Sequence, residues 1–145
     1  FDSVFVIDFG ERLKSVLTSF MFSDVSNKKV NFFTINQWFD ETFFNENATQ
    51  NLHFPSIDFD NLKKFNKKFS NIFNEEPNKV SILAYDALGL IYYCWLNNNF
   101  QFQKDQLYNK KGFKGLHGEF IIVGNQSLQK LKIYKISKKK FIKVY

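Results

Sequence analysis

The first third of the chain combines short apolar segments with one longer segment of helical period. Residues 3–9 are apolar on both alternating sets of positions, and residues 30–35 repeat that pattern, which is typical of parallel strands covered on both faces. Between them, apolar residues recur at helical spacing over residues 11–22. The pattern predicts a strand–helix–strand unit with two adjacent, parallel strands and a right-handed crossover.

The middle of the chain begins with a segment that has no clear period. Residues 36–56 are rich in asparagine and are predicted to form an unusually long connection. The next helix is expected to begin with Asp58 or Asp60 as its N-cap and to end at Pro77. Its lysines lie mostly on one side, which we expect to face solvent. The residues expected on its buried side are Leu62, Phe65, Phe69, Ile72 and Phe73.

Residues 81–96 form the most apolar segment, although Asp86 lies in its middle. The segment is shorter than the roughly 20 residues that span a bilayer, and a carboxylate near its centre would cost about 2.5 to 3.5 kcal/mol on insertion. A buried helix explains it better than a membrane span. Because its apolar positions lie nearly all the way round, we expect neighbours on most sides, Leu88 and Ile91 in the core, and a hydrogen-bond partner for Asp86.

The last third changes to strand patterns after a polar stretch that holds at most a short helix, around residues 104–108. Turn-like residues separate the predicted strands, which favours a β-meander. These strands lie near residues 119–123, 129–136 and 141–145. The complete pattern predicts an α/β fold over residues 1–145 as a single region, with a parallel β-α-β sheet, flanking helices and a C-terminal antiparallel meander.

Composition indicates a folded chain and limits its partners. With 145 residues, 44% of them hydrophobic and 19% aromatic, the chain can bury a sizeable core. The net charge of +6 comes from scattered lysines and a single arginine, whereas surfaces that read bases use arginine forks and exposed stacking rings. Solvated helix and strand faces therefore explain the lysines better than nucleic acid or anionic lipid does, and we expect no nucleic-acid partner.

Few residues suit metal or catalytic chemistry. Cys94 is alone, which excludes an internal disulfide and a cysteine-based zinc site. His53 and His117 lie far apart and lack a short ligand spacing. Asp8-Phe9-Gly10 spells the metal-binding triplet of protein kinases, but no other kinase motif accompanies it, and nothing resembles a nucleophile elbow. We expect no metal, no cofactor and no enzymatic activity.

Candidate ligand contacts follow the two predicted parallel strands. Phe9 and Gly10 come after the first strand, and Asn36, Gln37 and Trp38 come after the second. Open α/β sheets bind ligands beyond the carboxyl ends of their parallel strands, so both sets should face one crevice. The free N–H groups of the first helix could receive an anion there. Ordinary strand-to-loop transitions, with Trp38 as a packing residue, are the alternative.

Several segments together resemble a known family. They are FDSVFVIDFG at residues 1–10, FFTINQWFD at 32–40, Ala84-Tyr85-Asp86-Ala87, GFKGLHGEF at 112–120 and LKIYKISKKKFIKV at 131–144. They resemble the C-terminal part of type I periplasmic-binding-protein-like domains, the two-lobed family of branched-chain amino-acid receptors. Within that family, residues 38–40 and 115–118 look more like the branch of penicillin-binding-protein activator lipoproteins.

The resemblance implies a non-catalytic module outside the cytoplasm, periplasmic or anchored to the outer membrane. The chain would be most of one lobe plus a piece of the other, with an N-terminal half upstream. Its partner would be a peptidoglycan synthase that it activates; the alternative is a receptor that brings an amino-acid-like ligand to the membrane components of an ABC importer. Tyr85, near the hinge side, joins the candidate ligand contacts. Where the receptors carry an acidic residue after the second strand, this chain has Asn36-Gln37.

Overall fold

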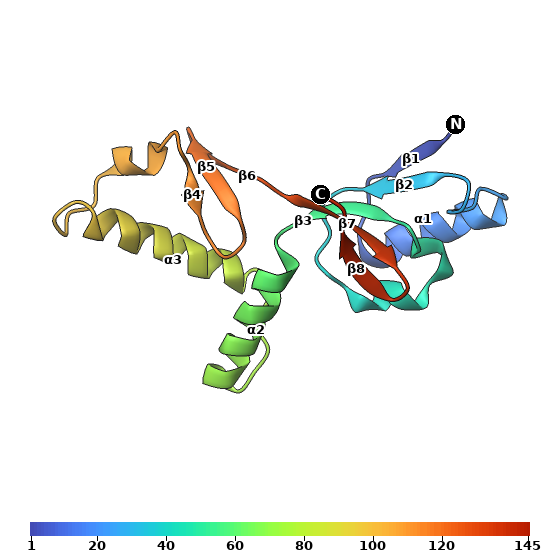
Figure 1. Cartoon of the computed structure of the whole chain (residues 1–145), viewed down its shortest axis with the longest axis horizontal. Coiled ribbons are helices and arrows are strands. Elements are labelled where there is room, and N and C mark those ends of the chain that lie inside the picture. The colour runs from blue at the N-terminus through green and yellow to red at the C-terminus, as the bar shows by residue number, and fades with distance from the viewer. The chain divides into compact units, whose positions relative to one another are not determined.

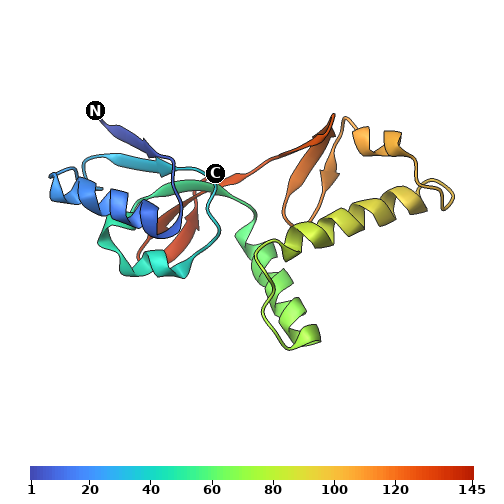
Figure 2. The ribbon, with the colours of Figure 1, turned by 180° about the vertical axis from the view of Figure 1, so that it is seen from behind.

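The computed structural model describes all 145 residues, and they form two compact units. Unit 1 consists of Phe1–Ser56 and Lys132–Tyr145, and unit 2 of Ile57–Leu131. Each unit has its own sheet and its own helices, which can be followed by colour in Figure 1 and from behind in Figure 2. The two units are described separately below.

Unit 1 is built on a mixed five-stranded sheet in the order β1-β2-β3-β7-β8. Strands β1, β2 and β3 are parallel, whereas β7 runs antiparallel to β3 and β8 antiparallel to β7. The predicted parallel pairing of the first two strands is confirmed. The strand bounds are β1 Ser3–Val6, β2 Asn31–Thr34, β3 His53–Ser56, β7 Lys132–Ser137 and β8 Lys140–Lys143.

One helix, α1 (Gly10–Phe22), connects β1 to β2 and packs on the sheet. Leu13 and Leu17 are buried, and the Phe20 ring lies 5.6 Å from the Phe32 ring of β2. The alternate positions of the first strand are uncovered, since Phe5 is 60% exposed. The prediction that this strand is covered on both faces is therefore wrong for these 145 residues.

The connection predicted between residues 36 and 56 contains structure that its sequence did not reveal. It holds two short 3₁₀ helices, η1 (Glu41–Asn45) and η2 (Asn47–Thr49), and then β3. Strand β3 contains Pro55, although proline is unusual inside a sheet. The Pro55 carbonyl accepts from the Gln37 N–H at 3.3 Å, so its missing donor lies on the β2 side. There the β2–β3 register includes only Phe33 with His53, and no ladder hydrogen bond is lost.

Unit 2 contains two helices and a small antiparallel sheet in the order β4-β5-β6. Asp58 caps α2, because its carboxylate accepts from the Asn61 N–H at 3.0 Å, which confirms one of the two predicted caps. The helix ends at Asn74, whose left-handed φ of 55° stops it before Pro77. The bounds are α2 Phe59–Phe73, α3 Ser81–Leu96, η3 Lys104–Tyr108, β4 Phe113–Lys114, β5 Glu119–Val123 and β6 Gln126–Gln129.

The predicted C-terminal meander is wrong in its connectivity. The predicted strand at 129–136 is split between β6, which ends at Gln129, and β7, which begins at Lys132. Strands β5 and β6 pair in unit 2, whereas β7 and β8 pair in unit 1. The split at residues 129–132 contains no glycine or proline, so the sequence pattern does not show that the chain changes sheets.

The helix α3 matches its predicted range but not its predicted burial. Ile82 and Cys94 are buried, whereas Leu88 is 68% exposed and Ile91 is 50% exposed. The prediction that these two residues lie in the core is wrong within this chain. In α2, Phe65 is buried but Ile72 and Phe73 are exposed, so its buried side is also narrower than predicted. Neither helix, nor any other in the structure, is both long and apolar enough to cross a membrane.

Candidate functional site

The loops that follow β1 and β2 lie together at the carboxyl edge of the parallel strands in unit 1. The side chain of Gln37 donates from Nε2 to the Asp8 carbonyl at 3.0 Å, and Thr34 Oγ1 lies 3.4 Å from the same oxygen. These bonds link the end of the first strand to the end of the second. The structure therefore brings the two predicted sets of unit 1 residues to one edge.

Gln37 is the centre of this edge. It is 3% exposed, and Ser56 Oγ donates to its carbonyl at 2.7 Å, while its own N–H donates to the Pro55 carbonyl. Its backbone and side chain thus tie together the loops after β1 and β2 and the end of β3. In this unit, Gln37 positions the two loops that carry the other predicted ligand contacts.

The other predicted residues at this edge are more open to solvent. Phe9 is 57% exposed and is the extended N-cap residue of α1; its N–H donates to Asp8 Oδ1 at 2.8 Å. Gly10 has a left-handed φ of 52°, and a Cβ added there would meet no atom within 4 Å. Asn36 is exposed and Trp38 is half-buried. The open face of the edge therefore combines aromatic rings with a carboxylate and an amide.

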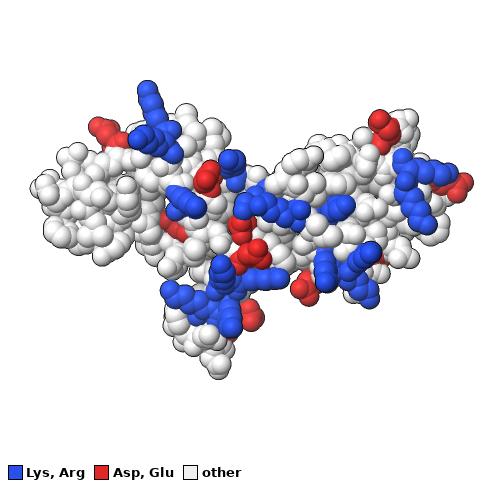
Figure 3. All heavy atoms as spheres, in the orientation of Figure 1, with Lys and Arg blue, Asp and Glu red and all other residues white.

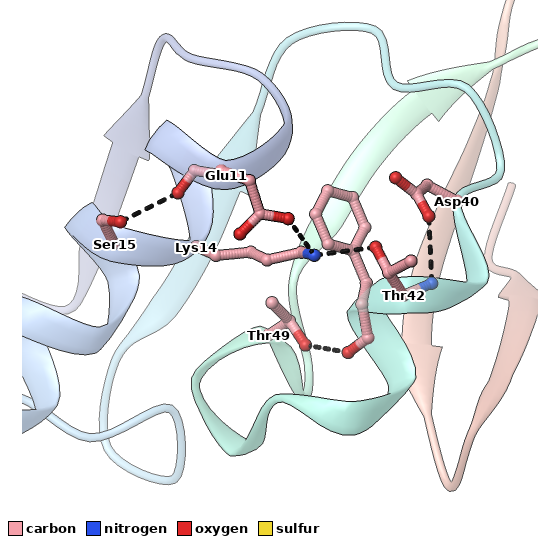
Figure 4. Close-up of polar contacts among 7 residues, drawn as sticks. Glu11, Lys14, Ser15, Asp40, Thr42 and Thr49 are labelled. Atoms are coloured by element: carbon pink, nitrogen blue, oxygen red, sulfur yellow. Dashed lines mark hydrogen bonds and ion pairs between the residues drawn. The ribbon is translucent and has the colours of Figure 1, made fainter.

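A polar cluster that the sequence reasoning missed holds α1 against η1 (Figure 4). Lys14 is buried, and its Nζ lies 2.8 Å from Glu11 Oε1 and 2.7 Å from Thr42 Oγ1. The Nζ also lies 5.4 Å from the centroid of the Phe43 ring. The one feature of the sequence that could have indicated this cluster is the position of Lys14, which lies beside Leu13 on the buried side of the helix.

Asp86 of α3 holds the loop before β5. Its carboxylate accepts from the Leu116 N–H at 2.9 Å and from the His117 N–H at 2.8 Å, and it also contacts His117 Nδ1. A Cβ at Gly115 would collide with this carboxylate, so only glycine fits there. The predicted hydrogen-bond partner of Asp86 is confirmed, and the carboxylate has a structural role in unit 2.

Tyr85, the sixth predicted contact, lies on α3 and belongs to unit 2. It is about half exposed, and its ring lies 5.7 Å from the Phe65 ring of α2. The other five predicted residues belong to unit 1. A site that contains all six residues stays a prediction.

Unit 2 has cavities of its own. One of about 460 Å³ lies between α3 and the small sheet and is lined by Asp86, Tyr93, Phe113 and Phe120 among others. Asp86 is already engaged there by the backbone N–H groups of Leu116 and His117. The other charged residue of the lining is Lys114, which is exposed.

Charge and metal chemistry single out no further site. Lysines gather over α2 in Figure 3, where Lys63, Lys64, Lys67 and Lys68 are all exposed. No group of three or more histidine, cysteine, aspartate or glutamate residues is arranged to hold a metal ion. Burial raises the pKa of the Cys94 thiol, which favours its neutral form.

Comparisons with known proteins identify relatives by structure alone. No protein-family model and no curated protein matches the sequence. A protein described as a branched-chain amino acid ABC transporter from Rhodospirillum rubrum matches with a TM-score of 0.68 and 9% identity, over 94% of this chain and 49% of its own. A leucine-binding protein from Thermotoga maritima matches with a TM-score of 0.67 and 12% identity, over 99% of this chain and 44% of its own.

An extracellular ligand-binding receptor from Desulfohalobium retbaense matches with a TM-score of 0.63 and 17% identity, over 97% of this chain and 26% of its own. The chain thus spans half or less of the length of each of these structures. Identities this low show the fold alone. The predicted fold class is confirmed: the chain has an α/β fold that matches part of type I periplasmic-binding-protein-like structures.

Proposed function

We propose that the chain is the C-terminal part of a two-lobed solute-binding receptor that takes an amino-acid-like ligand outside the cytoplasm. The receptor would deliver this ligand to the membrane components of an ABC importer. Support comes from the three structural relatives, each of which is described as a transporter, a receptor or a binding protein for amino acids or other ligands.

The observation that carries the proposal is the edge where β1 and β2 end. Gln37 is buried and fixes the two loops, whereas Phe9 and Asn36 are exposed and Gly10 is partly exposed. Ligands of open α/β sheets bind beyond the carboxyl ends of the parallel strands. Because the loops are held by Gln37 and the residues beside it are exposed, this edge is better suited to contact a ligand than to pack inside unit 1.

The chemistry of this edge fits an ammonium group. Asp8 is half-buried beside the exposed Phe9 ring, and its Oδ1 is held by the Phe9 N–H. A carboxylate attracts a cation through its charge, and an exposed aromatic ring attracts one through its quadrupole. Asp8 would then supply the acidic group that is missing after the second strand, where Asn36-Gln37 stands.

The earlier hypothesis of a penicillin-binding-protein activator finds no support in the comparisons. None of the three structures is described as an activator of a cell-wall enzyme. A peptidoglycan synthase partner and an outer-membrane lipid anchor are therefore left out of the proposal, and the periplasm is proposed as the location.

The test is calorimetric titration of the full-length gene product with a panel of amino acids. At least one should bind, and Phe9→Ala should weaken that binding by more than about 1 kcal/mol because buried ring contact is lost. Phe5→Ala is the matched control, since Phe5 is also an exposed phenylalanine of unit 1 but precedes the strand end. Absence of binding to every member of the panel would overturn the receptor hypothesis.

Trp38 gives a second readout at the same edge. It is half-buried after β2, and its ring can either contact the ligand or fill the crevice. If it contacts the ligand, Trp38→Ala should weaken binding by more than about 1 kcal/mol while circular dichroism stays unchanged. Equal affinity in wild type and variant would make Trp38 a packing residue.

A further inference from the structure

More than half of the circumference of α3 is exposed and apolar. At about 100° per residue, the exposed positions cover an arc of about 200° when Tyr93, which is exposed but lies on the side of the small sheet, is set aside. Leu88 is 68% exposed and Tyr92 is 58% exposed. The residues of this arc, called here the open face of α3, are Ala84, Tyr85, Ala87, Leu88, Gly89, Ile91, Tyr92, Trp95 and Leu96.

The open face lacks the composition of a solvated surface. It carries no charged and no amide side chain, and its polar groups are tyrosine hydroxyls and the indole N–H of Trp95. The neighbouring helix in sequence, α2, shows the ordinary arrangement, because its exposed positions include Lys63, Lys64, Lys67 and Lys68. A continuous exposed apolar surface of this kind marks an interaction site.

The opposite side of α3 already has its partners. Ile82, Asp86 and Cys94 are buried. The Tyr93 ring lies 6.2 Å from the Phe113 ring of β4, and the Asp86 carboxylate holds the loop before β5. The small sheet thus covers one side of the helix. It does not cover the open face, whose apolar composition therefore requires another partner.

We infer that a second apolar layer of the same domain, supplied by the same polypeptide, packs on the open face of α3. This inference rests on the proposed two-lobed domain, but not on its ligand. Two of the similar structures match 94% and 99% of this chain, but this chain matches only 49% and 44% of their length. They hold about as many residues again as the matched part, which is enough to supply a covering layer.

A membrane surface fits the open face poorly. Helices that lie in a membrane interface pair their apolar side with a polar side rich in lysine or arginine, and α3 contains neither residue. Its sixteen residues also fall short of a membrane span.

Cysteine labelling of the full-length gene product tests the inference. Leu88→Cys places a thiol on the open face, and Lys67→Cys places one on the exposed side of α2 as the matched control. Cys94 is 2% exposed, so the wild type gives the background. A water-soluble maleimide should label Leu88→Cys about ten-fold or more slower than Lys67→Cys in the native protein, and both should react equally in urea.

Three results would overturn the inference. Equal native labelling of both variants would mean that the open face is exposed. Protection that weakens on dilution would mean that a second copy covers it, and protection seen only with added anionic vesicles would mean that lipid does. Ala87→Cys on the same face serves if circular dichroism shows that Leu88→Cys does not fold. If Leu88→Cys is protected from labelling but calorimetry detects no ligand, the covering layer is supported and the receptor hypothesis is rejected.

Discussion

The helices α1 and α3 each rest one side on a sheet and each bury one charged side chain, but they differ in the side that faces away. On α1 that side carries Glu11, Arg12, Ser15 and Ser19, all exposed. On α3 it is the apolar open face. The amphipathic pattern of α1 is therefore satisfied along most of its length, although Val16 and Phe22 are exposed, whereas the pattern of α3 is only half satisfied.

The two buried charges also differ in the kind of partner that they have. Lys14 of α1 meets side chains, the carboxylate of Glu11 and the hydroxyl of Thr42. Asp86 of α3 meets the backbone N–H groups of Leu116 and His117. Side-chain partners can turn to water when the charge is removed, but backbone groups fixed in a buried loop cannot. Removal of Asp86 should therefore cost more than removal of Lys14.

The largest expected effect separates the two sides of α3. Ile82 is fully buried and Leu88 is largely exposed, so Ile82→Ala should lower the free energy of unfolding by about 2 to 5 kcal/mol. Leu88→Ala should change it by less than about 0.5 kcal/mol in the 145-residue chain, because no cavity forms. Urea titration followed by circular dichroism measures both. Similar losses for the two variants would mean that the open face is packed within this chain.

The next effect concerns the buried carboxylate. Asp86→Ala leaves the two backbone N–H groups of Leu116 and His117 without an acceptor, which should cost about 2 to 4 kcal/mol in total. Asp105→Ala in η3 is the control, since Asp105 is exposed and should cost less than about 0.5 kcal/mol. Hydrogen exchange at Leu116 and His117 should accelerate in Asp86→Ala alone. Unchanged exchange there would show that the loop is held by other contacts.

The elements with clear local signals could be predicted from the sequence. The helical period of α1, the long apolar segment of α3 and the cap at Asp58 could be recognised, because each is set by nearby residues. Strand β3 was missed, since it lies in an asparagine-rich segment without a clear period. It also contains Pro55, which is unusual inside a sheet and is tolerated through the sparse pairing with β2. The change of sheet between β6 and β7 was missed because no glycine or proline marks it at residues 129–132.

Candidate-site residues were predictable by position but not by role. The rule for parallel strand ends placed Phe9 and Asn36 at one edge, as the structure does. The same rule could not distinguish the buried bridge Gln37 from its exposed neighbours, because that role depends on Ser56 and Pro55 far along the chain. Burial of α3 was overestimated, since apolar composition indicates that a face needs a partner but not which chain segment provides it.

The smallest expected effect concerns the other buried charge. Lys14→Met keeps most of the side-chain volume and removes the charge, and Glu11 can return to water because its side chain is 87% exposed. An ion pair with one exposed partner contributes little to stability, so the free energy of unfolding should change by less than about 1 kcal/mol. Urea titrations at low and high salt measure this change. A loss above about 2 kcal/mol, larger at low salt, would mean that the Lys14 charge holds α1 to η1 and that the contrast with Asp86 fails.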